Sequence, residues 1–265
     1  MSLGDLGIGS INGGSIGVIN AIINGNFQVN QRAVSGTVTL AAGAYGHDRW
    51  KAGASGCTYT FATSNNVTTL TISAGSLIQV IEGLNLYSGT YTLSWTGTAQ
   101  GKIGAGSYAG SGVTGAAVGG TNLNIEFNTG TVSLVQFEQG SVATPFERRP
   151  YGTELNLCMR YYQQYSQINN FGPIDLGVSI FSNDTATVRG STVLPVPMRA
   201  APVLSLVSGT IAIDNYGSAV TTTISGYAAS ARGLQFSGTG SGYTTGRPSY
   251  LIGSPTAVLA LNSEL

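Results

Sequence analysis

The chain has 265 residues, of which 42% are hydrophobic and 8% charged, and its 11 basic and 11 acidic groups cancel. This hydrophobic content suffices for packed cores and excludes a disordered tail. The scarcity of Lys and Arg excludes a nucleic-acid surface, which needs clustered cations to neutralise phosphates. There is no basic amphipathic face and no apolar run of about 18 residues, so we expect no membrane insertion.

Glycine is abundant, with 39 residues. It favours short strands and tight turns, because it adopts positive φ easily and weakens helices by about 1 kcal/mol relative to alanine. Residues 1–20 mix glycines with large apolar side chains, each of which costs about 1.5–3 kcal/mol to leave in water. We expect an arm that docks on a partner chain or a neighbouring copy; a flexible tail is the alternative. The arm lacks a signal peptide's basic segment and apolar core, which predicts synthesis and folding in a cytoplasm.

Residues 21–149 have the pattern of strands. In 89–99, for example, Tyr91, Leu93 and Trp95 alternate with polar residues, and a period of two is typical of half-buried strands. Regular spacing of such segments predicts an antiparallel sandwich or barrel. The glycine-rich stretch 101–120 is expected to be a long loop or a weak hairpin. The expected strands are 36–43, 57–64, 66–74, 76–83, 89–99, 121–128 and 131–140.

One helix is expected, over 152–165, as a connector between two domains. Thr153 is placed to cap it, and Glu154 lies in the first turn, where the helix dipole favours an acid. Strand patterns return after it, at 177–182, 186–195, 202–214, 218–230, 233–238 and 256–265. The sequence therefore predicts an all-β fold, divided into an arm (1–20), a β domain (21–150), a connector (151–166) and a smaller β domain (167–265).

Two cysteines and one histidine limit the chemistry available to the chain. Cys57 and Cys158 can form a disulfide, but we expect two free, buried thiols. With His47 they lack the spacing of zinc ligands, so we expect no metal and no cofactor. None of the acidic residues sits in a paired motif such as a glycosidase needs, and His47 has no serine elbow nearby. We predict no catalytic residues and no enzymatic activity.

Charged residues concentrate in two segments, "NGNFQVNQRA" (24–33) and "YGHDRWKAG" (45–53). A catalytic centre is one interpretation, and a folding signature is the one we favour. If the first and last strands of the domain are neighbours, Arg32 or Arg49 can pair with Glu138 or Glu147. Trp50 is then a core residue beside a partly buried ion pair; sugar stacking is its alternative role. The predicted structural signature comprises Arg32, Asp48, Arg49, Trp50, Glu138 and Glu147.

Parts of the chain resemble the tail fibre and receptor-binding proteins of tailed bacteriophages, which carry a carbohydrate-binding-like jelly-roll domain. These parts are "INGNFQVNQRA" with "DRWKAG", "VQFEQGSVATPFERRPYGTELNLCMRYYQ", and "VLPVPMRAAPVLSL" with the closing "AVLALNSEL". The resemblance covers roughly 22–50, 131–165, 193–206 and the last ten residues. It implies a jelly-roll β-sandwich near 21–150, followed by the C-terminal β domain. It also implies a homotrimer and a place on the virion exterior near host recognition.

Tyrosine is the most abundant aromatic residue, at 13. It combines contact area with a polar tip and little entropy to lose, which suits exposed recognition surfaces. The best candidate for an exposed loop is "GTGSGYTTGRPSY" (238–250), and Tyr87 and Arg232 lie in similar turn-rich contexts. The candidate ligand-binding residues are Tyr243, Arg247, Tyr250, Tyr227 and Tyr108.

We expect a non-catalytic adhesin of the phage tail that recognises host cell-surface polysaccharide. It would be assembled in the host cytoplasm and would contact other virion proteins through residues 1–20. The alternative is a structural virion subunit (baseplate, collar or capsid fibre) whose jelly roll binds protein.

Overall fold

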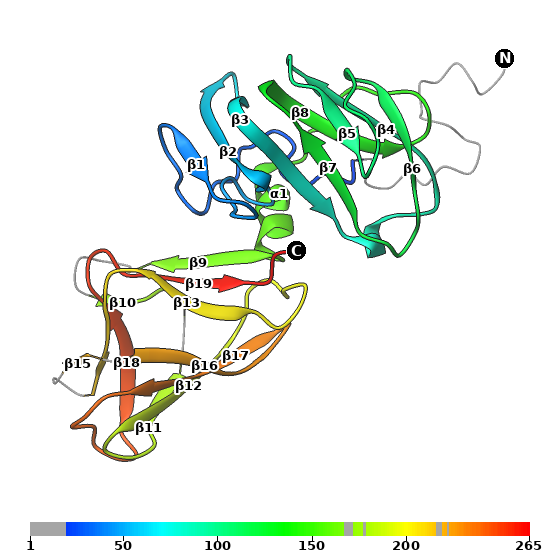
Figure 1. Cartoon of the computed structure of the whole chain (residues 1–265). Coiled ribbons are helices and arrows are strands. Elements are labelled where there is room, and N and C mark those ends of the chain that lie inside the picture. The colour runs from blue at the N-terminus through cyan, green and yellow to red at the C-terminus, as the bar shows by residue number, and fades with distance from the viewer. Residues whose placement is uncertain (1–19, 167–171, 177–178, 216–218, 222) are drawn as a thin grey trace. The chain divides into compact units, whose positions relative to one another are not determined.

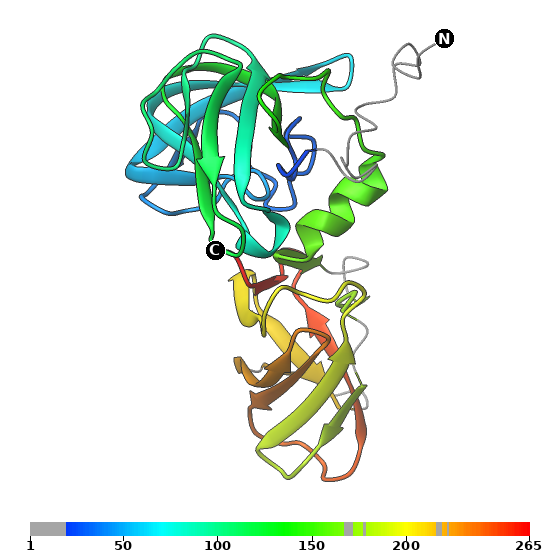
Figure 2. The same cartoon turned by 90° about the vertical axis from the view of Figure 1, so that its right-hand side faces the viewer.

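The structure, a computed structural model, describes residues 20–166, 172–176, 179–215, 219–221 and 223–265. The fold is all-β, with one α-helix and antiparallel sheets in a sandwich-like arrangement. The described residues form two compact units, whose elements can be followed by colour in Figures 1 and 2. The first contains the residues as far as Gln28 with Val34–Gly46 and Trp50–Arg149; the second contains Val29–Ala33, His47–Arg49 and Pro150–Leu265. The arm predicted for 1–20 lies outside the described residues, apart from Asn20.

The first unit has eight strands in one hydrogen-bonded network. The order is β1-β2-β3-β8-β4-β6, and β7 pairs with β3 and β5. The long strand β3 pairs with β8 through Leu70–Ile72 and with β7 through Leu77–Ile81, so its two halves have different neighbours. The elements are β1 Val38–Leu40, β2 Lys51–Ser64, β3 Val67–Ile81, the 3-10 helix Gly83–Asn85, β4 Gly89–Thr96, β5 Gly101–Ile103, β6 Val113–Ala117, β7 Leu123–Phe127 and β8 Gly130–Gln139.

Strands β2 and β3 form a long hairpin around Asn65 and Asn66. Both asparagines have positive φ, 50° and 57°, which two-residue hairpin turns of type I′ require. The sequence predicted two strands where β3 is one, because Gly75 interrupts the pattern. Gly75 has φ +71°, and a Cβ there would lie 2.0 Å from the carbonyl oxygen of Gly56. The backbones of β2 and β3 therefore approach each other at Gly75, where only glycine fits. Strand β3 continues through this residue.

The core of the first unit is centred on aromatic rings. Trp50 is fully buried, and its indole nitrogen donates a hydrogen bond to the carbonyl of Asn24 at 3.0 Å. Its ring lies 4.9 Å from that of Phe27 and 6.1 Å from that of Phe127, measured between centroids. Trp50 is thus a packing residue, with its one polar atom satisfied by the backbone.

The second unit is built from two antiparallel sheets. One has the order β15-β14-β18-β11-β12-β17-β16, with β10 paired to β18, and the other has the order β13-β19-β9. Their apolar faces share one core, which includes Val188 and Phe236 from the larger sheet and Leu259 and Leu261 from the smaller. The strands are β9 Tyr162–Ser166, β10 Gly172–Pro173, β11 Ser179–Ser182, β12 Thr187–Val193, β13 Val203–Ser208, β14 Ile211–Asp214, β15 Ala219–Thr221, β16 Thr223–Ser230, β17 Gly233–Thr239, β18 Pro248–Gly253 and β19 Val258–Asn262.

The helix α1 spans Tyr151–Met159 and is shorter than predicted. Pro150, not Thr153, is its N-cap residue, and Glu154 lies in the first turn as expected. The predicted end at 165 was wrong because Tyr162–Ser166 forms β9, which pairs with β19. The tyrosines of this segment favour a strand, and the available partner strand decides the outcome. No helix in the described ranges is long and apolar enough to cross a membrane.

The stretch 101–120 contains two short strands that do not pair with each other. β5 pairs with β7, whereas β6 pairs with β4. Glycines in this stretch permit tight turns around both strands, including Gly104 and Gly112 with φ of 55° and 93°. The segment is therefore part of the sheet network, and within it Gly101 and Ala109 also form an isolated antiparallel bridge with two backbone hydrogen bonds, as a weak hairpin would.

Candidate functional site

The outer face of the larger sheet in the second unit is the best candidate for a binding surface. Along β11, β12, β17 and β18, side chains alternate between buried and exposed, so one set packs into the core and the other faces solvent. We call the solvent-facing set the aromatic face. It comprises Phe181, Arg189, Gln235, Pro248 and Tyr250.

Two aromatic rings stand on this face with more than half of their surface exposed. Phe181 is 51% exposed and Tyr250 is 63% exposed. Phe181 lies directly opposite Pro248 on β18 and opposite Arg189 on β12. Tyr250 is two residues beyond Pro248, on the diagonal from Phe181, where side chains are about 7–8 Å apart. Aromatic rings next to a guanidinium on a flat sheet provide the stacking faces and planar donors that sugar rings and other polar ligands use.

A buried polar network fixes the edge of the aromatic face. Asn215 donates hydrogen bonds to the hydroxyls of Ser182 (2.9 Å) and Ser249 (2.8 Å), and its side-chain oxygen accepts from the backbone N–H of Thr244 (3.0 Å). Ser182 and Ser249 belong to β11 and β18, next to Phe181 and Tyr250. The strands that carry the two rings are therefore held in register by a third element.

The predicted ligand residues fall into different places. Tyr250 lies on the aromatic face, and Arg247 is exposed just before β18. Tyr243 is not on the surface: its ring is 2% exposed and belongs to the core of the second unit. Tyr227 lies within β16, and its side chain is outside the described ones.

Tyr108 belongs to the first unit, in a different polar cluster. Its hydroxyl donates to Glu126 at 2.8 Å, and Lys102 pairs with the same carboxylate at 2.9 Å. Burial and the neighbouring Glu126 raise the pKa of Tyr108 to about 12. Burial alone would raise the pKa of Glu126, but hydrogen bonds from Ser76, Lys102 and Tyr108 hold it below its usual value. Tyr108 thus belongs to a different unit from the other four predicted ligand residues.

The charged signature of the sequence forms a buried ion cluster inside the second unit. Arg49 pairs with Glu264, which also lies 3.5 Å from Arg32, and Arg32 lies 3.8 Å from Asp48. The guanidinium of Arg32 stacks over the ring of Tyr162 at 3.6 Å, and that of Arg49 over the ring of Tyr161 at 3.5 Å. Two positive and two negative charges are therefore neutralised together between tyrosine faces.

The structure gives the arginines a different acid from the two predicted, because Arg32 and Arg49 pair with Glu264. Residues 29–33 and 47–49 fold with the second unit, whereas Glu138 and Glu147 fold with the first. Glu138 accepts hydrogen bonds from Gln136 and Thr144 instead. Glu147 accepts one from the backbone of Asn20 and pairs with Arg149 at 3.3 Å. The ion pair expected within one sandwich is replaced by a cluster around Glu264.

The titratable groups around the cluster are buried. Burial lowers the pKa of His47 to about 4, so it is neutral at pH 7. Burial raises the pKa of Asp48, whereas hydrogen bonds from Gln31 and the charge of Arg32 lower it.

The two cysteines, Cys57 and Cys158, are free and buried, and burial raises the pKa of Cys57 to about 11. Across the described residues, no three His, Cys, Asp or Glu side chains gather as metal ligands would.

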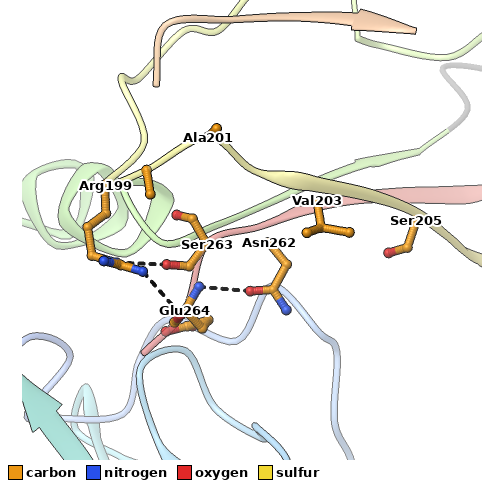
Figure 3. Close-up of a pocket in the computed structure, with 8 residues that line it drawn as sticks. Arg199, Ala201, Val203, Ser205, Asn262, Ser263 and Glu264 are labelled. Carbon is orange, nitrogen blue, oxygen red and sulfur yellow. Dashed lines mark hydrogen bonds between the residues drawn. The ribbon is translucent and has the colours of Figure 1, made fainter. Parts of the chain in front are cut away.

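A shallow groove of about 470 Å³ lies beside β13 and the end of β19 (Figure 3). Arg199 lines it, but its guanidinium donates to the carbonyls of Ser263 (2.9 Å) and Glu264 (3.4 Å). The side chain of Asn262 accepts a hydrogen bond from the N–H of Glu264. These polar groups are engaged by the protein, and the remaining lining includes Ala200, Ala201 and Val203.

Sequence reasoning missed Phe181, Arg189 and Gln235. A signal was present in "SIFS", because Ile180 and Phe181 are adjacent and successive side chains of a strand point to opposite faces, so only one of the two can enter the core. A large aromatic residue on the polar side of an alternating strand predicts an exposed ring.

No family model matches this chain, and no curated protein or solved structure matches it.

Proposed function

We propose that this chain is a non-catalytic receptor-binding adhesin of a bacteriophage tail, and that it binds host-surface polysaccharide through the aromatic face. The resemblance of 22–50, 131–165 and 193–206 to phage tail fibre and receptor-binding proteins supports the setting. In this proposal the first unit is the jelly roll and the protein is part of the virion, assembled in the host cytoplasm. Residues 1–20 attach it to other virion proteins, and copies associate as a homotrimer.

The observation that carries the proposal is the pair of exposed rings on a rigid sheet. Phe181 and Tyr250 lie on neighbouring strands whose register is held by Asn215, so little ordering entropy is lost when a ligand stacks on them. Arg189 adds planar donors beside Phe181. Weak single sites suffice for such a protein, because several copies on one virion multiply the apparent affinity.

The absence of catalysis in this proposal follows from the use of the acidic groups. Glycosidases need two carboxylates facing one bond. Asp48 and Glu264 are paired with arginines in the buried cluster, and Glu126 is held by Lys102 and Tyr108. These carboxylates are committed to structure, which favours binding over cleavage.

The test is binding of fluorescently labelled protein to host cells before and after periodate oxidation of their surface sugars. We expect saturable binding that periodate abolishes and that purified surface polysaccharide competes. Replacing Phe181 or Tyr250 by alanine should weaken binding by about 1–3 kcal/mol, as for buried aromatic anchors, or roughly 5- to 150-fold.

Tyr87→Ala is the matched control, because Tyr87 is 75% exposed but belongs to the first unit. It should bind like the wild type. If Tyr87→Ala and Tyr250→Ala weaken binding to cells equally, the aromatic face is not the binding surface. Binding that survives periodate, or no binding to cells at all, would favour the alternative of a structural virion subunit. The apolar edge strand β13, which suits a protein partner, favours that alternative.

A further inference from the structure

Strand β13 is an uncharged edge strand with exposed apolar side chains. It stands at the end of the order β13-β19-β9, and within the described parts of the chain its one strand partner is β19. Val203 is 69% exposed and Val207 is 56% exposed. Between Arg199 and Asp214 the sequence contains no charged residue. One side of the strand therefore offers backbone hydrogen-bonding groups next to apolar side chains.

Such an edge is a template for pairing with another chain. Natural proteins usually block open edges with lysines, prolines or bulges. β13 has Pro202 just before it and a register shift between Leu206 and Ser208, which together bound the open segment without closing its middle. No charge protects Leu204, Ser205 and Leu206.

The sequence of this segment indicates what pairs with it. Residues 203–207 read Val-Leu-Ser-Leu-Val, the same in both directions. Antiparallel pairing of two copies about Ser205 places Val203 opposite Val207 and Leu204 opposite Leu206, so like faces like at each position. We propose that β13 pairs with β13 of a second copy of this chain about a two-fold axis. An isologous contact of this kind needs a self-complementary patch, and a palindromic strand is one.

The groove in Figure 3 adds apolar surface beside this edge. Val203 and Ser205 line it from β13, opposite Asn262 on β19. Arg199 donates to backbone carbonyls, and the carboxylate of Glu264 is paired with Arg32 and Arg49. The apolar part of the lining includes Ala201 and Val203. A second copy on the edge would cover both the strand and the rim of the groove.

This contact is independent of glycan binding and of the three-fold assembly that the resemblance implies. A three-fold axis cannot relate two strands as an antiparallel pair, whereas a two-fold axis through Ser205 pairs β13 with its own equivalent. The expected species in solution is a dimer, or a hexamer if trimers also form.

Cysteine cross-linking of the full chain tests the register. In an antiparallel pair, opposite Cα atoms are about 4.5–5.5 Å apart, within the range that a disulfide spans. Ser205→Cys alone should therefore form a disulfide-linked dimer under mild oxidation. Val203→Cys alone should not, because the two copies of residue 203 would be four residues, or about 13 Å, apart along the strand. A mixture of Val203→Cys and Val207→Cys should cross-link, and the native Cys57 and Cys158 are buried and should not contribute.

The mass in solution gives the second measurement. Ser205→Lys puts a charge on the open edge and should halve the mass measured by light scattering, while Val193→Lys should not, since Val193 is 83% exposed on another strand. A wild-type monomer or trimer overturns the proposal. So does cross-linking of Val203→Cys alone as fast as that of Ser205→Cys.

Discussion

Replacing Glu264 with alanine should destabilise the second unit and leave the first unchanged. Glu264 is the shared acid of the buried cluster, paired with both Arg32 and Arg49. The side chains of Glu264 and Arg49 are 4% and 1% exposed, so solvent cannot replace the lost carboxylate. Arg32 still has Asp48 in the variant, and the cost therefore comes mainly from Arg49.

The expected cost is about 3–5 kcal/mol, the usual penalty for removing one partner of a buried ion pair. A factor of ten corresponds to about 1.4 kcal/mol. The equilibrium constant for opening of the second unit should then rise by roughly 150-fold to several thousand-fold.

Each unit carries one buried thiol, which makes the effect measurable for each separately. Cys158 is in the second unit and Cys57 in the first. Under native conditions a thiol reagent modifies them only when they become exposed, so labelling rates, read by mass spectrometry of the two peptides, report opening of each unit. Glu264→Ala should accelerate labelling of Cys158 by at least about 100-fold and leave Cys57 unchanged.

Lys102→Gln is the matched control, since it removes one partner of the more exposed pair with Glu126. Such a pair contributes about 1 kcal/mol or less, so labelling of Cys57 should change less than about fivefold. If Glu264→Ala accelerates Cys158 by no more than this, the cluster contributes no more than a surface ion pair and the reasoning from burial fails.

Two other predictions concern pH and backbone geometry. His47 has its pKa lowered from 6.5 to about 4 by burial. Between these values the unfolded chain binds a proton that the folded chain does not, so the free energy of unfolding falls as pH falls, by about 2 kcal/mol from pH 7 to 4.5. Urea unfolding at pH 7 and 4.5 should show a smaller loss of unfolding free energy for His47→Gln than for the wild type. An equal loss in both proteins would contradict the prediction. Gly75→Ala should destabilise the first unit by more than about 2 kcal/mol, because strain at positive φ adds to the clash with Gly56. Gly36→Ala has a similar φ with no atom within 4 Å, so it should cost only about 1 kcal/mol in the same urea titration, and equal losses in both variants would refute the clash.

The strands were largely predictable because alternation is a local property of the sequence. Tyr91, Leu93 and Trp95 indicated β4, and the structure places it at Gly89–Thr96. The failures occurred where distant partners decide local structure. Tyr162–Ser166 continues a helical sequence, yet it becomes β9 because β19 offers a partner nearly a hundred residues later.

The candidate site was predictable only in part, for a related reason. Tyr250 and Arg247 were identified from turn-rich composition, but that criterion cannot distinguish exposed Tyr250 from buried Tyr243 seven residues earlier. The charged signature was recognised, but the structure pairs its arginines with Glu264 and not with the predicted Glu138 or Glu147. Nothing near Arg49 in the sequence points to Glu264, because their pairing spans 215 residues.

That span has a consequence for synthesis of the protein. Chains emerge from the ribosome at about 5–20 residues per second. Glu264 is therefore synthesised roughly 10–40 s after Arg32 and Arg49, with which it pairs. The first unit can fold during this interval, before Glu264 has been synthesised to pair with Arg49. Slower elongation through residues 150–260 should therefore prolong the lifetime of a nascent chain in which only the first unit is folded. During the same interval, chaperones can bind the nascent chain, and molecules with acidic surfaces can bind its arginines.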